Sequence, residues 1–186
     1  LSVLLSPSKS AVPVAQAAVA SLAKIGTPVV SVAAALARSA PEAQPLLASA
    51  RAERVALGLE EHELELTENA HVAVAADVLA AIGTIGAAEA VVDALATADA
   101  AQKPLLALAL PRLPANARSI DAYKSAFEAI PIDAILVDGS LARQRMLSAT
   151  SGFNDATLVP WLLARATARD VVVTTNFLTV DVEDYR

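Results

Sequence analysis

Apolar residues occur in short runs along the chain, and turn-forming residues separate one run from the next. Runs at residues 1–5, 29–32, 105–110 and 132–137 predict buried strands, and the β-branched stretch 171–175 predicts another. Such runs are typical of parallel strands that are covered on both faces. The pattern therefore indicates a sheet whose strands return by crossovers.

Segments with helical character lie between these runs. The Ala- and Val-rich stretch up to about Ile25 is one, and residues 87–98 form a second with apolar side chains on one face. A third helix begins at Asn116 or Ser119 and runs to about residue 129, where Pro131 breaks it. The alternation of strands and helices predicts an α/β fold, a mostly parallel sheet with helices on both faces.

Three parts of the chain give weaker signals. Residues 33–67 suggest a short helix near Pro41, a strand over 54–57 and then an acidic surface stretch. Residues 69–81 fit a buried strand over 71–75 or a helix, because a short Ala/Val run does not distinguish the two. A long amphipathic segment covers residues 154–169, and no internal repeat stands out.

Composition narrows the classes of function. The 186 residues are 55% apolar and 3% aromatic, which suits one domain with a core of Ala, Val and Leu. A net charge of −6 disfavours nucleic acid as a partner, and the lack of Cys with only two His disfavours a metal site. The mean hydropathy is +0.51, but charged residues and Pro interrupt the apolar runs, so we expect a cytoplasmic protein without membrane insertion.

The last eleven residues carry the most specific pattern. They read N-F-L-T-V-D-V-E-D-Y-R and resemble the FtsZ loop G-L-I-N-V-D-F-A-D-V-R, with Asp181, Asp184 and Arg186 in register. Upstream, residues 152–155 resemble the opening of the central helix of FtsZ. Residues 83–86 look like a worn copy of its glycine-rich phosphate loop. The chain thus resembles the nucleotide-binding domain of the FtsZ/tubulin superfamily over nearly its whole length.

This resemblance implies a cytoskeletal protein of cell division that assembles head to tail into filaments. Residues 1–169 would form the Rossmann-like domain and 170–186 an acidic interface loop, after which the family continues into a further domain. Asp181 and Asp184 would act on GTP bound to the next subunit, with Mg²⁺ as a further ligand. The resemblance assigns nucleotide binding to Ser8, Lys9, Gly83, Thr84, Gly86, Arg118 and Phe153.

Departures from the family pattern weaken the GTP site. The first loop, residues 6–10, has no glycine and contains Pro7, although three hydroxyls and Lys9 remain. Ile85 would crowd a phosphate in the second loop. We therefore expect weak or absent GTP binding, and the sequence leaves open whether this chain is a GTPase across a subunit interface.

An alternative is a metabolic α/β enzyme, or a small-ligand-binding domain, with its site at the carboxyl ends of the strands. Other constellations are weaker. Ser148, Ser151 and Asp155 have no His at plausible sequence range, which disfavours a hydrolase triad. His71 fits a core or surface imidazole better than a catalytic base, and Trp161 fits a packing role.

Overall fold

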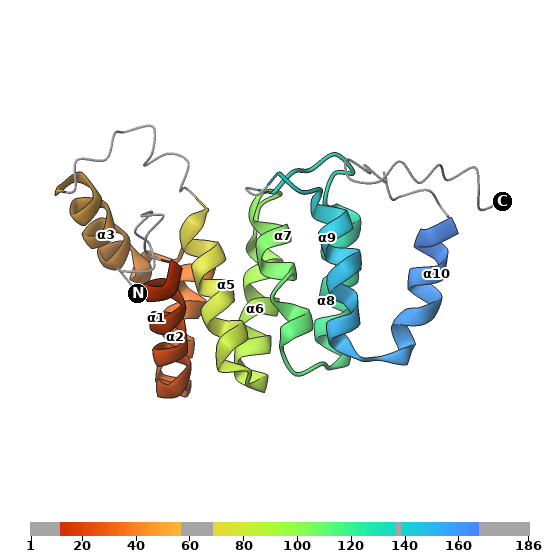
Figure 1. The fold of residues 1–186 in the computed structure, drawn as a ribbon, viewed down its shortest axis with the longest axis horizontal. Helices are drawn as coiled ribbons and strands as arrows, with labels where there is room; N and C mark the ends of the chain where they lie inside the picture. The colour runs from red at the N-terminus through yellow and green to blue at the C-terminus, as the bar shows by residue number, and fades with distance from the viewer. Residues whose placement is uncertain (1–11, 57–68, 137–138, 168–186) are drawn as a thin grey trace.

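Helices stand side by side in an elongated row, with the first three helices of the chain at one end and the last helix at the other (Figure 1). A computed structural model describes residues 12–56, 69–136 and 139–167. The helices α1 (Val12–Ile25), α2 (Thr27–Ala37) and α3 (Gln44–Ala56) lie at one end of the row, and α10 (Val159–Thr167) lies at the other. Between them come α5 (Ala70–Ile82), α6 (Ile85–Thr97), α7 (Gln102–Ala107), α8 (Ala117–Ala129) and α9 (Ala142–Ala149).

The predicted α/β fold is wrong, because the described residues contain no sheet. Residues 29–32 lie within α2, and residues 105–110 include the last half of α7, a turn and the first residue of a 3₁₀ helix. Residues 132–136 form a turn and an extended stretch, where Ile135 makes an isolated bridge to Leu141. The chain is all-α over its described part, so the Rossmann-like and FtsZ/tubulin assignments are also wrong.

Two weaker predictions are settled in favour of helices. Residues 54–56 of the expected strand 54–57 belong to α3, and residues 71–75 lie within α5. The expected strands at 1–5 and 171–175 lie outside the described residues.

Helix α2 shows why the strand prediction failed. Its buried side chains Val29, Ala33, Leu36 and Ala37 recur at the i, i+4, i+7 and i+8 spacing of one helix face. Pro28 lies in the first turn, where a missing N–H costs no helical hydrogen bond. Alanine is the best helix former, so an Ala/Val run that looks like a buried strand forms a buried helix.

The predicted helices are confirmed where a capping residue or a helix-breaking residue indicates one of their ends. Helix α8 begins after Asn116, whose side-chain oxygen accepts from the N–H of Ser119 at 2.8 Å. The Ser119 hydroxyl in turn accepts from the N–H of Asn116 at 3.0 Å, which completes a capping box. Helices α1 and α6 match predicted helices. The segment 154–169 is helical in part, through the 3₁₀ turn η6 (Ala156–Leu158) and α10.

Each helix packs mainly on elements that are close to it in the chain. Helix α5 lies against α1, α2, α6 and α7, and α8 lies against α6 and α7. The buried core is rich in alanine. Among the residues that the structure describes, large aromatic side chains lie only at the end of the row near α8 and α10. No single described helix is long and apolar enough to cross a membrane; α1 and α2 reach that length only as a pair bent by 120°.

The helix boundaries bring out an internal repeat in the sequence, contrary to our first expectation. The segments α1–α2–α3 and α5–α6–α7 share the same order of a helix, a Gly-Thr turn, a second helix, a short connection and a third helix. Identical residues occupy matching places in the two copies: Leu22, Ala23, Ile25, Gly26 and Thr27 correspond to Leu79, Ala80, Ile82, Gly83 and Thr84, and residues 45–48 correspond to 104–107, both Pro-Leu-Leu-Ala.

Backbone geometry supports the repeat at its two glycines. The N–H of Gly26 donates to the carbonyl of Leu22, and the N–H of Gly83 donates to that of Leu79, both at 3.2 Å. Both glycines have positive φ, 73° and 68°, a conformation that other residues adopt only with strain. The first helix of each copy therefore ends at a glycine with positive φ, although ψ differs, −131° at Gly26 and 23° at Gly83.

Another glycine is required by close packing. A Cβ atom on Gly152, in the 3₁₀ turn η5 (Thr150–Phe153), would lie 2.5 Å from the carbonyl oxygen of Pro111. Pro111 belongs to the 3₁₀ turn η4 (Leu110–Arg112), so η4 and η5 approach through backbone atoms that cannot move aside. Gly86, within α6, has nothing within 4 Å of the same added atom.

We therefore expect Gly152→Ala to lower the free energy of unfolding by about 1–3 kcal/mol, the usual cost of forcing an atom into a packed contact. Gly86→Ala, in the first turn of α6, is the matched control and should not lower it, because the added methyl group meets no atom and alanine restricts the unfolded chain more than glycine does. Urea unfolding followed by circular dichroism measures both. Equal midpoints for the two variants would contradict the close approach of η4 and η5.

Candidate functional site

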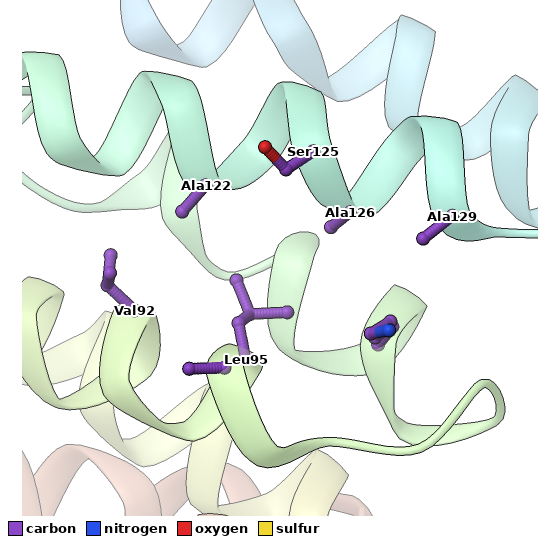
Figure 2. A pocket seen from close by; sticks show the side chains of 8 residues that line it. Val92, Leu95, Ala122, Ser125, Ala126 and Ala129 are labelled. Atoms are coloured by element: carbon purple, nitrogen blue, oxygen red, sulfur yellow. The ribbon is translucent and has the colours of Figure 1, made fainter.

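An apolar groove runs between α6, α7 and α8 and encloses about 310 Å³ (Figure 2). Figure 2 shows Val92 and Leu95 pointing from α6 towards the alanines of α8. The side chains that line the groove are Val92, Leu95, Ala96, Lys103, Ala122, Ser125, Ala126 and Ala129.

The groove exists because α8 presents small side chains on this face. Ala122, Ala126 and Ala129 follow the i, i+4, i+7 spacing that places residues on one side of a helix. The methyl groups of these alanines fill little of the space opposite Leu95. The groove is the space that remains between α6 and α8. Lys103 is the one charged residue among those lining it.

Helix α8 is fixed from its other face by a cluster of aromatic side chains, which we call the aromatic cluster: Tyr123, Phe127, Phe153 and Trp161. The rings of Tyr123 and Phe153 meet edge to face with centroids 5.0 Å apart, and those of Phe127 and Trp161 do so at 5.1 Å. Tyr123 and Phe127 are fully buried. The cluster ties α8 to η5 and α10.

Polar contacts complete this anchoring. The Tyr123 hydroxyl donates to the carbonyl of Met146 on α9, and the Thr150 hydroxyl donates to the same carbonyl at 3.0 Å. Burial raises the pKa of Tyr123 to about 12, and the Thr150 hydroxyl partly opposes that rise. Arg143 donates from Nε to the Ile130 carbonyl at 2.8 Å, with its guanidinium 5.0 Å from the Phe127 ring centroid.

Charge also holds the C-terminal end of α8. Arg165 on α10 pairs with Glu128, and its guanidinium lies 5.9 Å from the centroid of the Trp161 ring. Because the middle and the C-terminal end of α8 are fixed to α9, η5 and α10, the groove on another face of α8 has a preformed wall.

A second hollow of about 520 Å³, which we call the arginine hollow, lies where α5, α7, η4 and α9 meet. Its lining includes apolar residues such as Ala73, Leu105 and Leu108 together with Arg112 and Arg145. Arg112 pairs with Asp77 at 2.6 Å. The two hollows both include side chains of α7 but share no residue.

A serine and a histidine meet between α2 and α5. The Ser39 hydroxyl lies 2.8 Å from Nε2 of His71, a distance typical of a nucleophile and its base. However, the N–H groups of Ser39 and Ala40 already donate to the carbonyls of Leu36 and Ala35, at 3.0 and 2.9 Å, and cannot serve an oxyanion. Ser39 has a φ of 50°, so its bond to His71 supports a helix end that glycine usually occupies.

The residues assigned to nucleotide binding lie in separate places. Gly83 ends α5, and the Thr84 hydroxyl oxygen caps α6 by accepting from the N–H of Ala87 at 3.2 Å. Gly86 lies inside α6. Arg118, on α8, pairs with Asp93 of α6. Asp93 is eight residues, or about 12 Å along the helix axis, from Ile85, so Arg118 lies away from the turn at residues 83–86.

Phe153 is buried in the aromatic cluster, so it serves packing. The expected central helix does not begin at residues 152–155. Asn154 has a left-handed φ of 48°, and Asp155 caps η6 by accepting from the N–H of Thr157 at 2.8 Å. The hydrogen bonds from Thr157, and to a lesser extent Lys124, lower the pKa of this exposed carboxyl.

The remaining assigned residues, Ser8, Lys9, Asp181 and Asp184, lie outside the described residues, as does the expected interface loop 170–186. In the described ranges, no group of three or more His, Asp or Glu side chains comes together to hold a metal ion. Binding of GTP and Mg²⁺, and hydrolysis by Asp181 and Asp184, remain predictions. The FtsZ-like fold on which they were based is absent from the described residues.

Sequence reasoning missed both hollows. The signal for the groove was present in the Ala122, Ala126 and Ala129 spacing, but it reads equally well as an ordinary helix face. No protein-family model, no curated protein and no solved structure matches this chain.

Tyr123 gives a pH-dependent test of the aromatic cluster. An unfolded tyrosine ionises near pH 10, whereas the folded chain keeps this hydroxyl protonated to about pH 12. The resulting stability is fully present below pH ~10 and is lost as the pH rises towards 12. The melting temperature should therefore fall less steeply between pH 10 and 12 in Tyr123→Phe than in the unmodified chain.

At pH 7, Tyr123→Phe should cost only about 0.5–1.5 kcal/mol, because Thr150 still donates to the Met146 carbonyl. Tyr185→Phe, which changes the other tyrosine, is the control and should keep the steep alkaline fall. An equal alkaline slope in Tyr123→Phe and the unmodified chain would rule out a buried, neutral Tyr123.

Proposed function

We propose that this chain is a peptide-binding module whose apolar groove receives an apolar side chain of a partner, with a carboxylate of the partner beside Lys103. The observation that carries the proposal is the groove between α6, α7 and α8, which has apolar walls and one positive charge. An amphipathic partner helix or peptide recognised by an apolar groove is a common binding mode.

The chemistry of the lining favours binding over catalysis. Its walls are Val, Leu and Ala side chains, which provide contact area, and its polar groups are Ser125 and Lys103. A volume of about 310 Å³ lies at the lower end of the ~300–1,000 Å³ typical of small-molecule sites. A groove of this size suits one or two side chains of a peptide.

The preformed wall contributes to affinity. Helix α8 is held by the aromatic cluster and by the pairs of Arg143 and Arg165, so binding need not order it. Preorganisation of this kind lowers the entropy cost of association. Elongated helix rows are used elsewhere as binding surfaces, and this analogy of fold is in keeping with the proposal.

The test is selection of 12-residue peptides from a displayed library on the full chain. Enriched peptides should carry a Leu, Ile or Phe next to Asp or Glu. Ala122→Trp fills the groove and should weaken their binding at least tenfold, whereas Ala81→Trp, on an exposed position of α5 outside the groove, should not. Circular dichroism and thermal melts establish that both variants fold.

Lys103→Glu gives a second test that leaves the shape of the groove intact. It should reverse the charge preference, so that basic peptides replace acidic ones. Peptides that bind Ala122→Trp and Lys103→Glu as well as the unmodified chain would contradict the proposal.

Self-association and a cytoplasmic location stay predictions. Sedimentation of the unmodified chain and of Ala122→Trp tests whether a second copy fills the groove. Self-association that Ala122→Trp abolishes would replace the partner peptide by another copy of this chain.

A further inference from the structure

The side chains that line the groove all come from helices. Val92 and Leu95 lie in α6, Lys103 lies in α7, and Ala122 and Ala126 lie in α8. The backbone N–H and C=O groups inside a helix bond to one another, so these walls offer no backbone partner to an extended peptide. A strand laid on them would leave the N–H and C=O groups that face the walls unpaired, at a cost in free energy. A helical partner bonds its own backbone and avoids this cost.

The lining also disfavours a proline-rich partner. Domains that bind polyproline helices do so through grooves lined by aromatic side chains. Among the described residues that line this groove, none is aromatic, and the aromatic cluster packs on another face of α8. An amphipathic α-helix therefore fits the groove better than a strand or a polyproline helix.

The helices on the two sides of the groove run in the same direction. Figure 2 shows Val92 across from Ala122, with Leu95 further along in the direction of Ala129. The C-terminal ends of α6 and α8 therefore lie at the same end of the groove. From Ala122 to Ala129 the groove follows α8 for about 10 Å along the helix axis. This length accepts two side chains of a partner helix that are one turn apart.

Charge distinguishes the two ends of the groove. Arg118, one turn before Ala122 on α8, pairs with Asp93 of α6, so these two charges are matched. Lys103 lies at the other end, because its N–H donates to the carbonyl of Asp99, which follows the end of α6. Of the ion pairs among the described residues, none includes Lys103. A carboxylate of the partner is therefore favoured at the Lys103 end.

A partner helix itself favours a carboxylate at only one of its ends. Its first turn carries a partial positive charge, so Asp or Glu there stabilises the helix, whereas the same residue in the last turn destabilises it. A short peptide forms its helix only as it binds, so this preference adds to the affinity. The first turn of the partner should therefore lie beside Lys103.

We infer that the groove receives an amphipathic helix that runs antiparallel to α6 and α8. Asp or Glu in its first turn lies beside Lys103, and two apolar side chains, one turn apart, lie between Leu95 and the alanines of α8. This inference rests on the proposed function, because it specifies the conformation and the direction of a peptide in the same groove.

The conformation is tested with an alanine- and glutamine-based peptide of about 14 residues, with Glu in its first turn and Leu four and seven positions later. Isothermal titration measures its binding to the full chain. A second peptide, with Pro between the two leucines, cannot form the helix and should bind at least tenfold more weakly. Both peptides should lose binding to Ala122→Trp, which fills the groove.

Two outcomes overturn the inference and leave the proposed function in place. One is equal affinity of the two peptides, with both lost in Ala122→Trp. The other is no binding of the helical peptide, although peptides selected from the library bind the groove. Failure of the selected peptides and of both designed peptides to bind overturns the proposed function as well.

The contact with Lys103 is tested by a double exchange. Gln in place of Glu in the helical peptide should weaken its binding to the unmodified chain about two- to fivefold. The same exchange should have a smaller effect on binding to Lys103→Gln, because the charge that meets the Glu carboxylate is gone. An equal loss in both chains overturns the placement of the carboxylate.

The direction is tested by disulfide capture, since the chain has no cysteine of its own. Ala101→Cys lies near Lys103 and Asp121→Cys lies near Ala122, and both positions are exposed. In a glutathione buffer, a helical peptide with an N-terminal Cys should be captured by Ala101→Cys, and one with a C-terminal Cys by Asp121→Cys. The reverse pattern, or equal capture at both positions, overturns the antiparallel direction.

Discussion

Small side chains determine how closely the helices of this chain approach one another, and the rest of the structure depends on that approach. Ala33, Ala75, Ala87 and Ala94 are completely buried at the contacts of α2, α5 and α6. One methyl group lets backbones come close, but it also buries little apolar area, and the hydrophobic gain scales with area. Helix contacts built on alanine therefore bury little apolar area. A hollow remains wherever no larger side chain fills the space between two helices.

At the end of the row that includes α8, the aromatic cluster supplies the apolar area that the alanine contacts lack. The sequence has six aromatic residues, and four of them meet here: Tyr123, Phe127, Phe153 and Trp161. Each buries far more area than an alanine, so this cluster holds α8, η5 and α10 together where the alanine contacts end. The two faces of α8 thus differ in kind, large rings on one and methyl groups on the other, and the groove follows from that difference.

Capping chemistry could be read from the sequence, whereas the fold class could not. Asn116 and Ser119 form the capping box that begins α8, and Pro131 follows its end as predicted. By contrast, the run 29–32 fits a buried strand as well as a buried helix, because periodicity is lost when every position is apolar. The resemblance to FtsZ was drawn partly on such runs, and most of its terminal motif lies outside the described residues.

The hollows depend on context that local sequence does not contain. The two copies of the repeat have the same Pro-Leu-Leu-Ala motif, yet Pro104 and Ala107 of α7 are buried while the matching Pro45 and Ala48 of α3 are exposed. The difference arises because α5, α6, α8 and α9 pack around α7, whereas α3 makes its main described contacts with the short η3 turn, Pro41–Ala43. The groove and the arginine hollow both include side chains of α7. The second copy acquires its two hollows through the helices that follow it, so a search for motifs within either copy would find neither hollow.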